Sequence, residues 1–165
     1  MRKYFPKEYF DPEEQILMQA SCALFLLTRP YKFRGHTYMD AGLVDMIPIE
    51  QSIRQGNTKH VFISTKEENY VRKPAPGWQI QLAKLMYPGN KTIRENLKIR
   101  HINYQKQWQI VKELEEQGNA IVLRPSADYG VTRYTHDKEL LGRWFDLGYE
   151  DTKNRLDMIR EFMEK

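Results

Sequence analysis

The organisation of this 165-residue chain turns on residues 38–49, which read Tyr38-Met39-Asp40-Ala41-Gly42-Leu43-Val44-Asp45-Met46-Ile47-Pro48-Ile49. Residues 31–33 and 36–39 place apolar side chains in alternation around Arg34-Gly35, which predicts a β-hairpin. Asp40 follows the second strand directly, and Pro48 can open a short helix that ends at Gly56. A carboxylate at a strand end beside small residues can be approached by a substrate or by a partner side chain. A plain turn aspartate is the alternative interpretation.

On either side of this stretch the pattern alternates between helix and strand. Helices are expected over 11–27, 78–87, 92–117, 137–149 and 151–165, and buried strands over 60–64 and 120–123. Asp11 can cap the first helix, and Gly118 can end the long one. This order predicts an α/β fold with parallel strands and helical crossovers. Two buried strands are few for a parallel sheet, so the chain is expected to form part of a larger one.

Composition narrows the class of protein. The apolar and charged fractions, 41% and 29%, are those of an ordinary globular protein, and the net charge of +4 is modest. A single cysteine, Cys22, excludes an internal disulfide and is expected to be buried in its apolar surroundings. We find no membrane-spanning run and no secretory signal. A cytoplasmic protein is expected, with peripheral membrane contact as an option.

The stretch around Asp40 resembles the Asp-Gly-Gly or Asp-Gly-Ala motif of patatin-like phospholipases, in which apolar residues and a proline-started helix follow. Residues 20–24, Ala-Ser-Cys-Ala-Leu, resemble the family's helix end before this hairpin. Residues 100–104, 121–125 and 135–137 resemble the C-terminal region of one bacterial branch of the family. The similarity thus extends over nearly the whole chain.

The resemblance implies a three-layer α/β/α sandwich and a serine hydrolase that acts on acyl esters of the phospholipid or lysophospholipid type. In that family a Ser-Asp dyad carries the reaction, without metal or cofactor, and Asp40 takes the place of the dyad aspartate. Gly42 retains the second glycine of the motif, while Ala41 replaces the first. If that first position requires positive φ, Ala41 would be strained.

The nucleophile of the dyad has no counterpart in this sequence. There is no Gly-Gly pair and no Gly-x-Ser-x-Gly, and none of the serines (Ser21, Ser52, Ser64 and Ser126) has flanking glycines. A serine hydroxyl needs an adjacent base and preorganised N–H donors to attack an ester. Residues 1–165 are therefore expected to be the C-terminal part of a single patatin-like domain that lacks its nucleophile half. The isolated chain should be inactive and prone to self-association through unpaired strand edges.

Other classes of function stay open. A non-catalytic remnant could bind a protein partner or an acyl ligand. The four histidines, His36, His60, His101 and His136, lack metal-ligand spacing. The long helix carries Lys98, Arg100, Lys106, Trp108 and Lys112, which would suit RNA, although an amphipathic helix with a solvated face is the preferred interpretation and no nucleic acid is expected. Trp78, Leu82, Leu85, Met86 and Tyr87, near Lys73 and Lys84, could touch a membrane, but a core helix is preferred.

Overall fold

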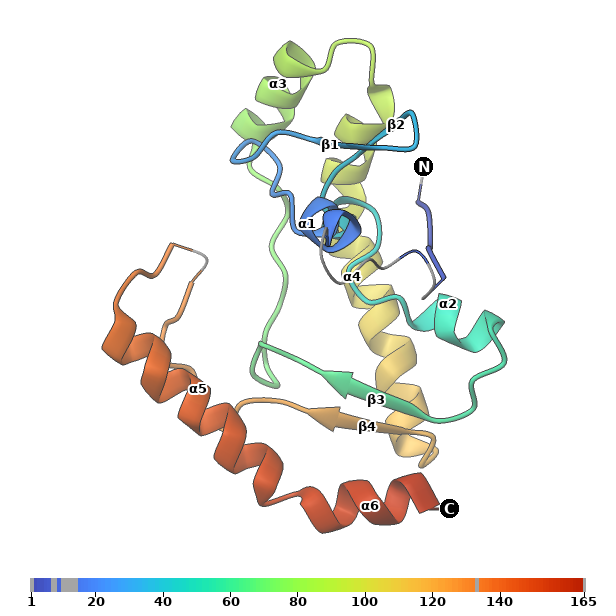
Figure 1. The fold of residues 1–165 in the computed structure, drawn as a ribbon, viewed down its shortest axis with the longest axis vertical. Helices are drawn as coiled ribbons and strands as arrows, with labels where there is room; N and C mark the ends of the chain where they lie inside the picture. The colour runs from blue at the N-terminus through green and yellow to red at the C-terminus, as the bar shows by residue number, and fades with distance from the viewer. Residues whose placement is uncertain (1, 7–8, 10–14, 133, 165) are drawn as a thin grey trace. The chain divides into compact units, whose positions relative to one another are not determined.

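The computed structural model describes residues 2–6, 9, 15–132 and 134–164 (Figure 1). Helices and short sheets alternate along the chain, which is compatible with the expected α/β class. The elements, in chain order, are α1 Ile16–Ser21, β1 Tyr31–Phe33, β2 His36–Tyr38, the 3₁₀ helix η2 Ala41–Leu43, α2 Ile49–Arg54, β3 His60–Ile63, α3 Gly77–Met86, α4 Lys91–Glu116, β4 Ala120–Leu123, α5 Lys138–Lys153 and α6 Leu156–Glu164.

Contacts divide the chain into two compact units. Unit 1 comprises residues 1–48 and 72–106, and unit 2 comprises residues 49–71 and 107–165. Helix α4 contributes its first part to unit 1 and its last part to unit 2.

The hairpin of unit 1 confirms the predicted pair of strands, although the second strand ends at Tyr38 and not at Met39. β1 and β2 are antiparallel, with Tyr31 opposite Tyr38 and Phe33 opposite His36. Arg34 and Gly35 both have positive φ, 47° and 74°. Two consecutive residues of positive φ are what a tight two-residue hairpin turn requires, because its twist then matches that of the strands.

The first helix is shorter than its sequence predicts. Its expected start, Asp11 to Glu14, lies outside the described residues, and α1 ends at Ser21 rather than near Leu27. After Cys22 the chain turns, and Leu26 adopts a φ of 72°, which no α-helix tolerates. The burial expected for Cys22 is wrong as well, since its side chain is exposed beyond the helix end.

The core of unit 1 gathers around η2, α3 and the first part of α4. Leu43, Ala83, Ile93 and Leu97 are buried together. The half-buried side chains packed around them are Phe25, Met39, Val44, Ala75, Ile80 and Tyr87. Met39 and Leu43 bracket Asp40 in sequence, so this core anchors the segment that carries the aspartate.

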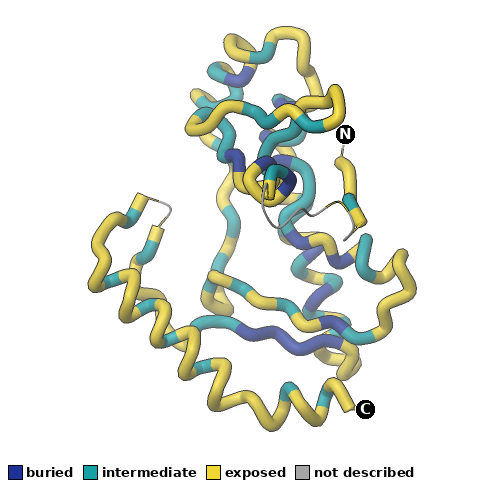
Figure 2. Tube along the Cα trace, in the orientation of Figure 1, coloured by how far each residue is buried: buried dark blue, intermediate teal, exposed yellow. Residues whose placement is uncertain are grey.

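Unit 2 is built on a parallel pair of strands, as the sequence predicted. β3 and β4 lie in register, with His60 opposite Ala120 and Ile63 opposite Leu123. All four residues of β4 are buried, but only His60 is buried in β3 (Figure 2). The expectation of a buried strand is therefore wrong for most of β3, because Val61 and Ile63 are 43% and 73% exposed.

Side chains alternate between the two faces of this small sheet. On one face Phe62 packs against Trp108 of α4, with ring centroids 5.2 Å apart. On the other face Ile63 and Leu123 line a cavity together with residues of α5. The sheet thus has helices on both sides, which is the usual environment of parallel strands.

The C-terminal helices divide at a different residue from the one predicted. Asp137 caps α5, as its carboxylate accepts the backbone N–H groups of Glu139 and Leu140. However, α5 continues to Lys153 instead of ending at Tyr149. Asp151 therefore does not start a second helix. Its carboxylate accepts the backbone N–H of Ser126, 2.8 Å away, which ties α5 to the segment after β4.

Candidate functional site

Asp40 follows β2 with only Met39 between them, close to where the sequence placed it, and is half-buried in unit 1. Its backbone N–H donates to the carbonyl of Ala23, 3.1 Å away. This hydrogen bond joins the residues after α1 to the start of the Asp40 turn. The two segments that carry the family resemblance before residue 50 are thus adjacent in the structure.

The Asp40 carboxylate is held by its own turn. Oδ1 accepts the backbone N–H of Gly42 at 2.6 Å, so Asp40 is the N-cap of η2. Among the residues that the structure describes, no hydrogen bond to Oδ2 is present. One oxygen therefore fixes the orientation of the carboxylate, while the other is available to accept a proton from a neighbouring group.

Backbone conformation decides the roles of Ala41 and Gly42. Neither residue has positive φ, so Ala41 is not strained at the position of the family's first glycine. Gly42 is needed for space: a Cβ there would lie 3.0 Å from Asp40 Oδ1 and 3.5 Å from Met46 Cγ. Its missing side chain lets the Asp40 carboxylate approach the Gly42 N–H.

Asp45 supports this turn from its far end. Its backbone N–H donates to the Ala41 carbonyl at 2.8 Å, and its carboxylate accepts a hydrogen bond from the Tyr4 hydroxyl and pairs with Arg2. The pKa of Tyr4 is raised, mainly because its hydroxyl is desolvated and secondly because of this hydrogen bond. The sequence offered no signal for these contacts, because Tyr4 and Asp45 are forty-one positions apart.

The four serines lie apart from Asp40 in the described hydrogen-bond network. Ser21 and Ser64 donate to nearby backbone carbonyls, of Met18 and Lys66 respectively. Ser126 lies on the exposed segment after β4, where its backbone N–H is bound by Asp151. Among the described residues, no hydrogen bond joins any of the four to the Asp40 carboxylate.

Ser52 forms a pair with a histidine that the sequence did not reveal. Its Oγ lies 3.1 Å from Nδ1 of the buried His60 and accepts a hydrogen bond from Asn57 Nδ2. The pair joins α2 to the first residue of β3 in unit 2. No glycine turn presents Ser52, so the hydroxyl lacks the neighbouring backbone donors that an esterase site uses.

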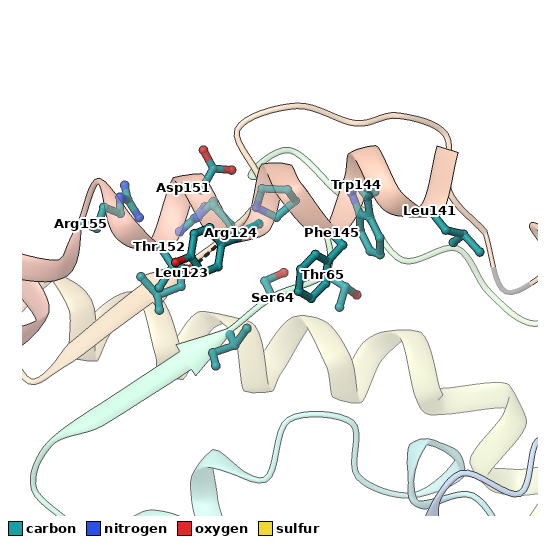
Figure 3. Close-up of a pocket in the computed structure, with 14 residues that line it drawn as sticks. Ser64, Thr65, Leu123, Arg124, Leu141, Trp144, Phe145, Asp151, Thr152 and Arg155 are labelled. Atoms are coloured by element: carbon teal, nitrogen blue, oxygen red, sulfur yellow. Dashed lines mark hydrogen bonds between the residues drawn. The ribbon is translucent and has the colours of Figure 1, made fainter. Parts of the chain in front are cut away.

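A cavity of about 370 Å³ in unit 2 is a second candidate site (Figure 3). It lies at the carboxyl ends of β3 and β4, where ligands bind in many open α/β sheets. Trp144 and Phe145 project into it from α5 (Figure 3). The full lining consists mostly of apolar side chains with a few polar ones: Ile63, Ser64, Thr65, Leu123, Arg124, Pro125, Leu141, Trp144, Phe145, Gly148, Tyr149, Asp151, Thr152 and Arg155.

Two arginines lie at the polar end of this cavity. Arg124 pairs with Glu115 at 3.4 Å and Glu68 at 3.5 Å. Arg155 donates from Nη1 to the backbone carbonyl of Val122 at 2.9 Å. The sequence predicts a helix here but gives no signal that its aromatic residues line a cavity, because they follow an ordinary amphipathic pattern.

The remaining candidate residues are dispersed. His36 and His136 are exposed, and His101 is half-buried in α4. Among the described residues, no three potential metal ligands form a group. Trp108 does not face solvent as an RNA-binding residue would, since it packs against Phe62 and the Arg124 guanidinium.

The residues proposed for membrane contact lie on or beside α3, and the preferred core interpretation is wrong for several of them. Trp78, Leu85 and Met86 are 60%, 78% and 49% exposed. Tyr87 does contribute to the core of unit 1. Over the described residues, no helix has both the length and the apolar character needed to cross a bilayer.

Comparison with known proteins gives one match. Residues 90–164 match a family model described as a domain of unknown function, DUF6363. The match covers less than half of the chain and takes in α4, β4, α5 and α6. No curated protein and no solved structure matches the chain.

Proposed function

We propose that this chain is the C-terminal part of a patatin-like acyl-ester hydrolase and that Asp40 is its catalytic aspartate. The observation that carries the proposal is the geometry of one carboxylate. Gly42 N–H fixes Asp40 Oδ1 at 2.6 Å, and a glycine is the residue that leaves room for this approach. An oriented carboxylate at a strand end is what a Ser-Asp dyad needs.

In the proposed reaction, residues outside this sequence supply the serine and the oxyanion donors. Asp40 Oδ2 accepts the proton of the serine hydroxyl while the serine oxygen attacks the ester carbonyl. Gly42 and Asp45 act as positioning residues, because they hold the turn that orients Asp40. The substrate class, phospholipid or lysophospholipid esters, follows from the family resemblance.

The proposal includes a three-layer α/β/α sandwich. Its support is the alternation of side chains in unit 2, where Phe62 meets α4 and Ile63 faces the cavity beside α5. A parallel sheet covered in this way usually has more than two strands. Further strands from the nucleophile half would pair with β3.

The decisive experiment compares two proteins, the chain 1–165 and the product of the same reading frame extended upstream until it includes a Gly-x-Ser-x-Gly segment. Both are assayed with a p-nitrophenyl ester and labelled with a fluorophosphonate, which reacts with activated serines. We expect no turnover and no labelling for 1–165. The extended protein should be active, and Asp40→Asn should lower its kcat at least about a hundredfold, as expected for loss of a catalytic base.

Asp146→Asn is the matched control, since Asp146 is an exposed carboxylate on α5 outside the cavity lining. It should keep full activity. Turnover by 1–165 alone that is lost in Asp40→Ala would contradict the proposed assembly of the site. Fluorophosphonate labelling of Ser52 would instead assign the nucleophile to the Ser52–His60 pair. An upstream sequence without the serine motif would refute the family assignment.

The cavity favours a second candidate function, the binding of an acyl ligand without catalysis. Its volume falls within the range of small-molecule sites, and its lining is mainly apolar. A fatty acid could place its chain between Leu123 and Phe145 and its carboxylate near Arg155. This function would not need Asp40.

Calorimetric titration of the chain with laurate tests this second function. We expect Phe145→Ala to weaken binding about tenfold, the effect of removing much of one apolar contact surface. Tyr134→Ala is the control, because Tyr134 is 64% exposed and does not line the cavity. Absence of laurate binding, or equal loss in both variants, would reject the cavity as an acyl site.

A further inference from the structure

Helix α3 is apolar on two opposite faces. Ala83, which is fully buried, and Ile80 turn one face toward the core of unit 1. Trp78, Leu82 and Leu85 follow one another at spacings of four and three, so they form a stripe along the helix. With 3.6 residues per turn, this stripe lies on the side away from Ala83. The core therefore does not account for it.

The stripe is exposed in the structure. Leu85 is 78% and Trp78 60% exposed, and Met86 at its border is 49% exposed. Leu82 is half-buried. A helix that is apolar beyond its core-facing side indicates a second apolar environment. Large exposed apolar patches on proteins commonly mark a binding surface.

The charge around the stripe has one sign. Residues 69–94 contain five basic residues and no aspartate or glutamate, although the whole chain has a net charge of only +4. Three of the five, Lys73, Lys84 and Lys91, are exposed. Lys91 pairs with Glu95, and Arg94 donates to the backbone carbonyls of Tyr87 and Pro88, which precede α4. Lys73 and Lys84 therefore provide cations beside the stripe.

We propose that α3, together with Lys73 and Lys84, is a contact site for a membrane surface that contains anionic lipid. Trp78, Leu82 and Leu85 enter the interface between headgroups and acyl chains, and the two lysines meet lipid phosphates. The helix lies along the surface, because its ten residues are too few to span a bilayer. Tryptophan suits this depth, since its ring is apolar and its N–H is polar.

This chemistry favours a bilayer over the other partners of a basic surface. A nucleic acid base could stack on Trp78 but would leave Leu82, Leu85 and Met86, which are aliphatic, without a partner. A lipid surface satisfies both the aliphatic stripe and the cations. The inference does not depend on Asp40 being catalytic. If Asp40 is catalytic, the contact brings the protein to a surface made of ester substrates.

The test measures cosedimentation of the chain 1–165 with vesicles of phosphatidylcholine and phosphatidylglycerol at seven to three, and with pure phosphatidylcholine vesicles. We expect binding to the anionic vesicles and at least about tenfold weaker binding of Leu85→Glu. Lys84→Glu should weaken binding in a salt-dependent way. Met163→Glu is the matched control, because Met163 is 62% exposed on α6 and does not line the cavity, and it should bind as the parent does.

A second measurement locates Trp78. Brominated phosphatidylcholine in the anionic vesicles should quench tryptophan fluorescence, and Trp78→Phe should remove this quenching while Trp108 and Trp144 remain. Circular dichroism confirms that each variant is folded. No vesicle binding, or binding that is the same in Leu85→Glu and Met163→Glu, would overturn the proposal. Vesicle binding without quenching would show that the protein is attracted only to the surface charge, and it would overturn the insertion of Trp78.

Discussion

Gly42 matters at the scale of the single residue because of space and not because of backbone freedom. Its φ is not positive, but a side chain at this position would meet the Asp40 carboxylate. Ala41, which departs from the motif that this stretch resembles, occupies an exposed position without strain. The two neighbours thus differ in tolerance: the turn accepts a methyl group at residue 41 and has little room for one at residue 42.

Gly42→Ala should therefore destabilise the chain. The new Cβ would stand 3.0 Å from Asp40 Oδ1, so the carboxylate must move and the hydrogen bond to Gly42 N–H weakens. We expect a loss of about 1 kcal/mol in the free energy of unfolding, measured by urea denaturation. Gly77→Ala is the control, since a Cβ there has no heavy atom within 4 Å. Equal stability of both variants would contradict the packing described for Gly42.

At the scale of the element, the two outer edges of the β3–β4 sheet differ. His60 N–H donates to Asn119 and Ser64 N–H to Leu123, so even-numbered residues of β3 face β4. The backbone groups of Val61 and Ile63 face the opposite edge. On β4, the carbonyl of Val122 accepts the Arg155 guanidinium, which covers that edge. Among the described residues, no comparable partner covers the edge of β3.

The open edge of β3 predicts self-association of the isolated chain. Unpaired ladder groups beside exposed apolar side chains are a template for another strand. Val61→Pro removes an N–H that faces this edge and leaves the hydrogen bonds to β4 in place, so it should shift the chain toward monomer. Light scattering over a concentration series measures the effect.

Val61→Thr is the control for this experiment, since it keeps both the β-branched shape and the backbone N–H. It should associate as the parent chain does. A parent chain that stays monomeric at all concentrations would show that the β3 edge is not a pairing site. The same result for the proline and threonine variants would place the association elsewhere.

At the scale of the whole molecule, the candidate functions fall into separate units. Asp40 and α3 belong to unit 1, whereas the cavity belongs to unit 2. The family match at residues 90–164 takes in both parts of α4 and most elements of unit 2, but not Asp40. The catalytic and the ligand-binding proposals can therefore be tested independently, by variants in different units.

Several elements could be predicted because their signals are local. The hairpin followed from alternation around Arg34-Gly35. The long helix and its end followed from apolar spacing and from Gly118, which has a φ of 72° in the structure. The end of α1 and the break between α5 and α6 could not be predicted. In both places a hydrogen bond to a residue far away in sequence affects where the helix ends. The Ala23 carbonyl accepts the Asp40 N–H beyond α1, and the Asp151 carboxylate accepts the Ser126 N–H within α5.

The sequence by itself determined where Asp40 stands, at the end of a strand and two residues before Gly42, because strand and turn signals depend on neighbouring residues. Tertiary structure alone decided that Tyr4 supports this turn through Asp45, that Trp78 and Leu85 are exposed, and that a cavity lies beside α5. An apolar residue has the same spacing in the chain whether it faces a core or solvent. Whether such a residue is buried or exposed depends on how segments far apart in sequence pack together.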